Sequence, residues 1–119
     1  MIYLSQRLVI RFHQDTRTIL DSIATEKGWK TPFLVTKIIE EEISSLDLSS
    51  YRVIKDEYRN LKKGIRGPKA AKQMSVWLSE DTLHAVKTIA ENHKDRIVFP
   101  TTVVRDITIK WLEDRHYNY

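Results

Sequence analysis

The feature that most constrains this chain is a repeated plan in which a short alternating strand precedes two helices. Residues 7–16 (RLVIRFHQDT) align with residues 73–82 (QMSVWLSEDT) at an offset of 66. In each segment apolar side chains recur at every second position, namely Leu8, Ile10 and Phe12, then Met74, Val76 and Leu78. Successive side chains of a strand point to opposite faces, so each segment has one apolar and one polar face. Because an isolated strand is unstable, we expect the two strands to pair within one chain, with pairing between two chains as the rival, and to expose a face suited to recognition.

Composition sets broad limits on function. The 119 residues are 41% hydrophobic and 30% charged, which is typical of one folded globular domain. No apolar run approaches the ~18 residues of a membrane span, and the N-terminal residues lack a secretory signal, so we expect a cytoplasmic protein without a membrane partner. The absence of cysteine excludes disulfides and thiolate metal sites. A net charge of +4 and a pI near 9.4 are compatible with a nucleic-acid partner.

Two predicted helices follow the first strand. Asp15 or Thr16 is suited to cap a helix over residues 16–27, whose apolar positions form one stripe. Thr31 before Pro32 is a typical helix start, a capping hydroxyl followed by a proline at the first helical position. The second helix carries apolar residues at helical spacing: Leu34, Val35, Ile38, Ile39, Ile43 and Leu46.

The second half of the chain repeats this plan with a longer turn. Asp81 and Thr82 open a predicted helix with the apolar stripe Leu83, Val86, Ile89 and Ala90. The last helix begins near Thr101, and its expected buried residues are Val103, Val104, Ile107, Trp111 and Leu112. Aligning the two second helices requires an offset of 69, so this turn is three residues longer.

The chain therefore divides into a first unit (residues 1–46), a linker (residues 47–71) and a second unit (residues 72–119). The linker is predicted to contain a short helix followed by an extended segment. Five of the eleven residues from 62 to 72 are basic and none is acidic: Lys62, Lys63, Arg66, Lys69 and Lys72. Such a run is either a solvated linker or an arm that contacts phosphates, and the sequence leaves both interpretations open.

A polar–apolar strand followed by two helices resembles the ribbon-helix-helix family of DNA-binding proteins. In that family two units pair their strands into an antiparallel ribbon, which enters the major groove, and their four helices form a shared core. The resemblance covers residues 5–46 and 72–115. Two units in one chain resemble the tandem transcription regulators of archaeal viruses, and also the accessory DNA-binding proteins of plasmid conjugation.

The resemblance implies both a fold and a function. The fold would be mainly α with a two-stranded antiparallel ribbon, its two ribbon-helix-helix units forming a pseudo-dimer joined by a helical linker. The function would be sequence-specific binding of double-stranded DNA by a transcription regulator, in the host cytoplasm if the protein is viral. Homodimers or cooperative assembly on DNA are compatible with this role.

In such a fold the polar strand faces would read bases. The candidates are Arg7, Val9 and Arg11 on the first strand and Gln73, Ser75 and Trp77 on the second. Arginine can contact guanine O6 and N7, glutamine can contact adenine N6 and N7, and Val9 or the Trp77 edge can contact a thymine methyl. A solvated strand face is the alternative for the arginines. Trp77 can instead cover the edge of the core or meet another chain.

The resemblance also implies phosphate binding at the N-terminus of each second helix. Free N–H groups and the helix dipole attract anions there. The phosphate-binding candidates are Lys30, Thr31, Phe33, Thr101 and Thr102, together with Lys69 and Lys72 of the basic run. Pro32 removes one N–H donor, for which the Thr31 hydroxyl can compensate.

No catalytic constellation stands out in the sequence. The four histidines (His13, His84, His93 and His116) are scattered, and three glycines leave no nucleotide-binding loop. We therefore expect no enzymatic activity, metal, cofactor or small-molecule substrate. An antitoxin-like interaction protein, or a helical module whose strands mediate oligomerisation, remains an alternative to DNA binding.

Overall fold

The computed structural model describes residues 5–44, 72–91 and 99–115. Its elements in chain order are β1 (Ser5–Ile10), α1 (Gln14–Lys27), α2 (Thr31–Ile43), β2 (Met74–Ser79), α4 (Glu80–Glu91) and α5 (Pro100–Asp114). The predicted mainly helical fold with a two-stranded ribbon is confirmed for these residues. The predicted linker helix, with Leu46, Lys69 and the turn before Phe99, lies outside the described residues.

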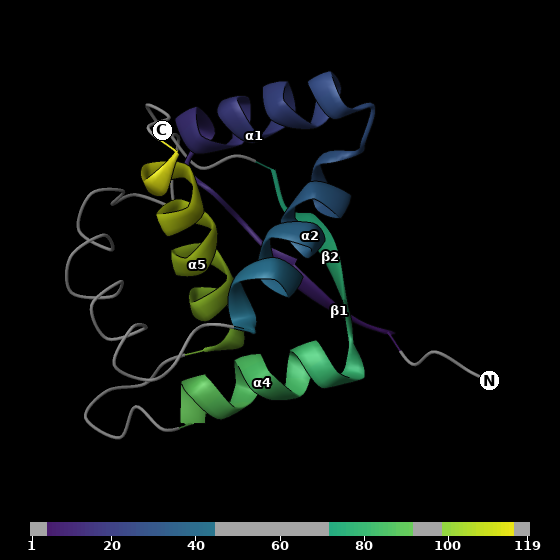
Figure 1. Ribbon diagram of the computed structural model, residues 1–119, viewed down its shortest axis with the longest axis vertical. Coiled ribbons are helices and arrows are strands. Elements are labelled where there is room, and N and C mark those ends of the chain that lie inside the picture. Colours follow the sequence, from purple (N-terminus) through teal and green to yellow (C-terminus); the bar gives the residue numbers. More distant parts are fainter. Residues whose placement is uncertain (1–4, 45–71, 92–98, 116–119) are drawn as a thin grey trace.

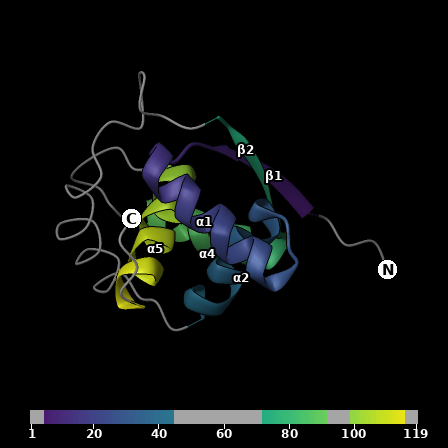
Figure 2. The same cartoon turned by 90° about the horizontal axis from the view of Figure 1, so that it is seen from above.

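The two strands form an antiparallel ribbon along one side of the helices (Figure 2). Ser5 pairs with Ser79 at one end of the ribbon, and Ile10 pairs with Met74 at the other. The predicted alternation is confirmed, because the inward side chains are buried while their neighbours are solvent-accessible. The buried residues are Ile10, Met74, Val76 and Leu78, with Phe12 two residues beyond β1 and Leu8 half-buried against the core.

The four helices of the described residues lie beneath the ribbon, and the second helix of each half contacts the strand of the other half. We call this arrangement the exchanged packing. Figure 1 shows α1 and α4 at opposite ends of the molecule, with α2 and α5 between them. In its strand contacts α2 lies mainly against β2, and α5 lies against β1, while α2 and α5 also contact each other. Each second helix therefore covers the strand of the other half. All the apolar residues predicted for the core of α4 and α5 are buried, and both helices pack against elements of both halves.

Three helix starts differ from the sequence-based prediction. His13 precedes α1 as its N-cap, and its Nδ1 accepts a hydrogen bond from the Asp15 N–H at 3.1 Å. The predicted caps Asp15 and Thr16 are therefore wrong, since the helix begins at Gln14, before either residue. At the other end Gly28 ends α1 in the left-handed conformation (φ 71°), which glycine adopts without steric cost.

The start of α2 is also built differently. Lys30 is the N-cap and makes no side-chain capping bond. The Thr31 hydroxyl instead donates to Asp21 Oδ1 of α1, an oxygen that also accepts from Arg17 Nε at 2.9 Å. The prediction of Thr31 as a capping hydroxyl is wrong because Thr31 is already the first residue of α2 and Lys30 holds the N-cap position. The Thr31 hydroxyl ties α2 to α1 instead.

The start of α4 lies one residue earlier than predicted, at Glu80. The Ser79 hydroxyl oxygen accepts from the Thr82 N–H at 3.3 Å, so the last residue of β2 supports the first turn of the helix. Strand and helix therefore join without an intervening loop, which holds the end of the ribbon against α4.

Candidate nucleic-acid interface

The outward face of the ribbon carries the six candidate base readers. Five of them are exposed, with 54% of Trp77 and 41% of Val9 accessible to solvent, and Ser75 is partly buried. The exposed five are Arg7, Val9, Arg11, Gln73 and Trp77. None of the six belongs to the hydrophobic core. The face therefore presents donors of two arginines and a glutamine beside two apolar side chains, a mixture that suits contact with base edges.

Cross-strand pairing gives the two ends of this face different chemistry. Val9 lies opposite Ser75 near the middle, and Arg7 lies opposite Trp77 toward one end. Arg11 follows the paired Ile10 and Gln73 precedes the paired Met74, so both lie at the other end. One end therefore combines a guanidinium with an amide, and the other combines a guanidinium with an indole.

The N-terminus of α2 lies close to the Trp77 end of the ribbon. Thr31 and Phe33 have N–H groups in the first turn, where no intrahelical acceptor exists, while Pro32 has none. The Leu34 N–H donates to the Lys30 carbonyl at 3.1 Å. Since the Thr31 hydroxyl hydrogen goes to Asp21, the backbone N–H of Thr31 is the donor that this residue can offer to an anion. Lys30 is exposed.

The N-terminus of α5 offers fewer donors. Pro100 occupies the first helical position and has no N–H. The Thr102 N–H donates to the Phe99 carbonyl at 2.9 Å, and the Thr102 side chain is buried. Of the two predicted phosphate-binding threonines at this end, Thr101 is the one with a first-turn N–H free of an intrahelical acceptor.

Of the two predicted basic contacts in the linker run, the structure describes Lys72. Its side chain is exposed, and its carbonyl accepts from Arg17 Nη1 at 3.3 Å. Lys72 is thus held beside α1 as the chain enters β2. Lys69 lies outside the described residues.

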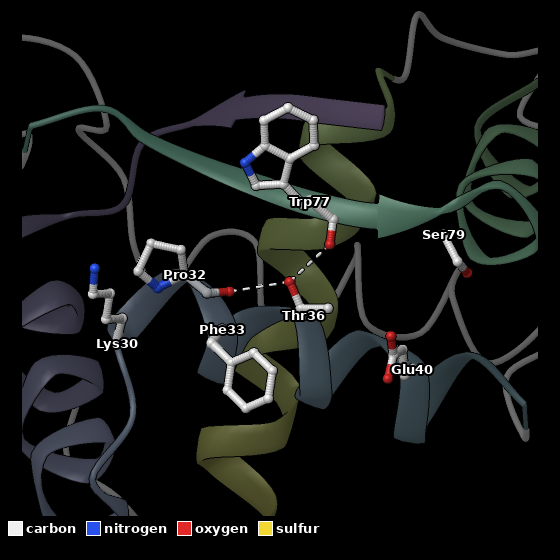
Figure 3. A pocket seen from close by; sticks show the side chains of 7 residues that line it. All are labelled: Lys30, Pro32, Phe33, Thr36, Glu40, Trp77 and Ser79. Carbon is white, nitrogen blue, oxygen red and sulfur yellow. Dashed lines mark hydrogen bonds between the residues drawn. The ribbon is translucent and has the colours of Figure 1, made fainter. Parts of the chain in front are cut away.

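A surface pocket of about 420 Å³ lies where the Trp77 end of the ribbon meets α2 (Figure 3). It is lined by Lys30, Pro32, Phe33, Thr36, Glu40, Trp77 and Ser79. The Thr36 hydroxyl lies 2.9 Å from the Trp77 carbonyl and 3.1 Å from the Pro32 carbonyl. Its single hydrogen is shared between these two acceptors, so Thr36 fastens the ribbon to the first turn of α2.

The sequence-based reasoning missed Thr36 and also missed Trp29, which stands between α1 and α2. Trp29 is 38% exposed, and its ring meets Phe33 edge to face, with the centroids 5.1 Å apart. The available signal was the position of both aromatic residues outside the apolar stripe of α2. Two exposed aromatic side chains in contact with each other form apolar surface of the kind that marks an interaction site.

Other kinds of site receive no support from the described residues. Within residues 5–44, 72–91 and 99–115, no three His, Cys, Asp or Glu side chains group as a metal site would require. No helix of the same segments has the length and apolar character needed to cross a membrane. Comparisons with protein-family models, curated proteins and solved structures returned no match.

Proposed function

We propose that this protein binds double-stranded DNA sequence-specifically through the β1–β2 ribbon and acts as a transcription regulator. The observation that carries the proposal is the two-sided ribbon. Its inward side chains are buried, while its outward side chains offer arginine and glutamine donors to solvent. The major groove of B-DNA admits a two-stranded ribbon, and these side chains match the hydrogen-bonding edges of guanine and adenine.

We further propose that the two units form a pseudo-dimer of the ribbon-helix-helix kind. In support, Val9 and Ser75 are paired in the ribbon and are also equivalent positions of the 66-residue repeat. A two-fold axis through the centre of a ribbon brings equivalent residues face to face in this way. The packing of α2 against β2 and of α5 against β1 follows the same exchange.

Phosphate contacts would fix the ribbon in the groove. The first-turn N–H groups of Thr31, Phe33 and Thr101 have no intrahelical acceptor, and the side chains of Lys30 and Lys72 are exposed, so these groups suit this task. These contacts carry no sequence information, so they would anchor any duplex equally. Discrimination between sequences would rest with the ribbon.

The test compares Arg11→Ala with the unchanged protein on two duplexes, one selected from random DNA and one of unrelated sequence. Loss of one bidentate contact should weaken binding to the selected duplex by roughly 1–3 kcal/mol, or about 5- to 150-fold, with little effect on the unrelated duplex. Fluorescence anisotropy at several salt concentrations measures both affinities.

Arg115→Ala is the matched control. It removes the same charge from the end of α5, where Arg115 pairs with Glu41 at 3.4 Å, so the ratio of the two affinities should stay unchanged. If Arg11→Ala leaves that ratio unaltered while the protein stays folded, the ribbon is not the reader. An interaction protein or an oligomerisation module would show no steep loss of DNA affinity with salt.

A further inference from the structure

Three exposed aromatic side chains lie together at one end of the ribbon. Trp29 and Phe33 meet edge to face at an interplanar angle of 88°, and Phe33 and Trp77 line the same pocket. They are 38%, 45% and 54% exposed, respectively. Contiguous apolar surface of this kind is costly in water and marks a place where something binds.

Three lysines surround these rings. Lys27 Nζ lies 5.3 Å from the centroid of Trp29, Lys37 Nζ lies 5.3 Å from the centroid of Phe33, and Lys30 lines the pocket. We name the six residues Trp29, Phe33, Trp77, Lys27, Lys30 and Lys37 the aromatic–lysine patch. The nearby Glu40 carboxylate pairs with Lys37 at 3.5 Å and offsets one of the three charges, so the patch stays positive.

We propose that the aromatic–lysine patch binds the sugar–phosphate backbone of one DNA strand beside the Trp77 end of the ribbon, an inference that rests on the proposed function. Deoxyribose presents apolar C–H surface to the rings, and the phosphates on either side meet the lysines. Trp77 belongs to both the outward ribbon face and the patch, so a duplex that receives the ribbon continues over the pocket (Figure 3).

Charge distinguishes this partner from a second copy of the chain. A symmetric contact between two copies would place the same patch on both sides, since a two-fold interface is self-complementary. Lys27, Lys30 and Lys37 would then face their own counterparts, which like-charge repulsion opposes. A polyanion with apolar sugar faces satisfies both the rings and the lysines.

The repeat makes this contact one-sided. At the offset of 69, Phe33 corresponds to the buried Thr102, and Lys37 corresponds to the buried acid Asp106. Trp77 corresponds to Arg11 at the offset of 66. The described counterparts of Phe33, Lys37 and Trp77 therefore include no exposed aromatic ring and no lysine. The protein should therefore make more contacts with the DNA backbone at the Trp77 end of the ribbon than at the Arg11 end.

The experiment is hydroxyl-radical footprinting and affinity measurement on the selected duplex with Phe33→Ser and, separately, Trp29→Ser. Each variant should bind both selected and unrelated duplexes about fivefold more weakly, because the exposed part of an aromatic ring no longer leaves water on binding. Backbone protection should shrink at one end of the footprint only. Lys37→Gln should lower the slope of log affinity against log salt by about one unit.

Phe99→Ser is the matched control, because Phe99 is 61% exposed at the start of α5 and lies outside the patch. It should leave protection at the Trp77 end intact. Circular dichroism establishes that each variant is folded, and using both Phe33→Ser and Trp29→Ser removes dependence on one position.

The outcomes separate this inference from the proposed function. If Arg11→Ala alters the affinity ratio but both serine variants keep full affinity and footprint, the patch inference is overturned and the ribbon function stands. If Phe33→Ser converts a DNA-free dimer to a monomer in sedimentation and leaves the footprint unchanged, the partner is a second copy. If the unchanged protein binds no duplex, both proposals fall together.

Discussion

Replacement of Phe12 by alanine tests the exchanged packing. Phe12 follows β1 on its inward side and is 1% exposed within a core built from both halves. Removing a buried phenylalanine ring costs about 3–5 kcal/mol of unfolding free energy. The unfolding entropy of a 119-residue chain is about 0.25 kcal/mol/K, so Phe12→Ala should lower Tm by about 12–20 °C.

The fluorescence of Trp111, as the one tryptophan left in a double variant, provides the assay. The chain has three tryptophans, so a background with Trp29→Phe and Trp77→Phe leaves Trp111, buried in α5 of the second half. Because α5 packs against β1, loss of the Phe12 ring should shift the urea transition of Trp111 fluorescence and that of circular dichroism equally.

Val9→Ala is the control on the same strand, and at 41% exposure it should cost less than about 1 kcal/mol. A Phe12→Ala loss as small as that of Val9→Ala would refute the buried placement of Phe12. A Trp111 transition that stays in place while the circular dichroism shifts would refute the shared core.

Three further predictions concern the ribbon and its surroundings. Thr36→Val should lower the free energy of urea unfolding by about 0.5–1.5 kcal/mol, because the Trp77 carbonyl loses its hydroxyl donor. Thr18→Val is the control and should cost less, because the Thr18 hydroxyl donates only within α1. Equal losses would contradict the role of the Thr36–Trp77 hydrogen bond. Selection from random DNA should return an asymmetric site for each bound chain, since the two ends of the ribbon differ in chemistry; a short perfect palindrome for each chain would contradict this. Lys72→Ala and Lys69→Ala should each lower the slope of log DNA affinity against log salt concentration by about one unit if these lysines contact phosphates. An unchanged slope would identify a solvated linker.

The sequence predicted the features that depend on local periodicity. Alternation placed Val76 and Leu78 on the face of the ribbon toward the core and Trp77 on the face toward solvent. Helical spacing identified the buried faces of α2 and α5. These predictions succeeded because one face of each element must leave water whatever its neighbours are.

Helix starts were harder to predict because side-chain partners decide them. His13 caps α1 through its ring nitrogen, a role that the capping preferences of Asp15 and Thr16 obscured. The Thr31 hydroxyl is taken by Asp21, ten residues earlier, and no local pattern indicates that pairing.

The aromatic–lysine patch could not be predicted for a related reason. Trp29 and Phe33 are near each other in sequence, but Trp77 comes from the other half of the chain. The three rings gather because α2 lies against β2, and that packing depends on the whole fold.

The exchanged packing also determines when this protein can fold during its synthesis. β1, α1 and α2 leave the ribosome before β2 has been made, yet Ser5 finds its partner in Ser79 and Ile10 finds its partner in Met74. Until translation has passed Ser79, β1 has no partner strand and α2 has no strand to cover. The first half therefore cannot complete its folding until the second half has been synthesised. The incomplete chain is the species most open to strand exchange with a neighbouring copy.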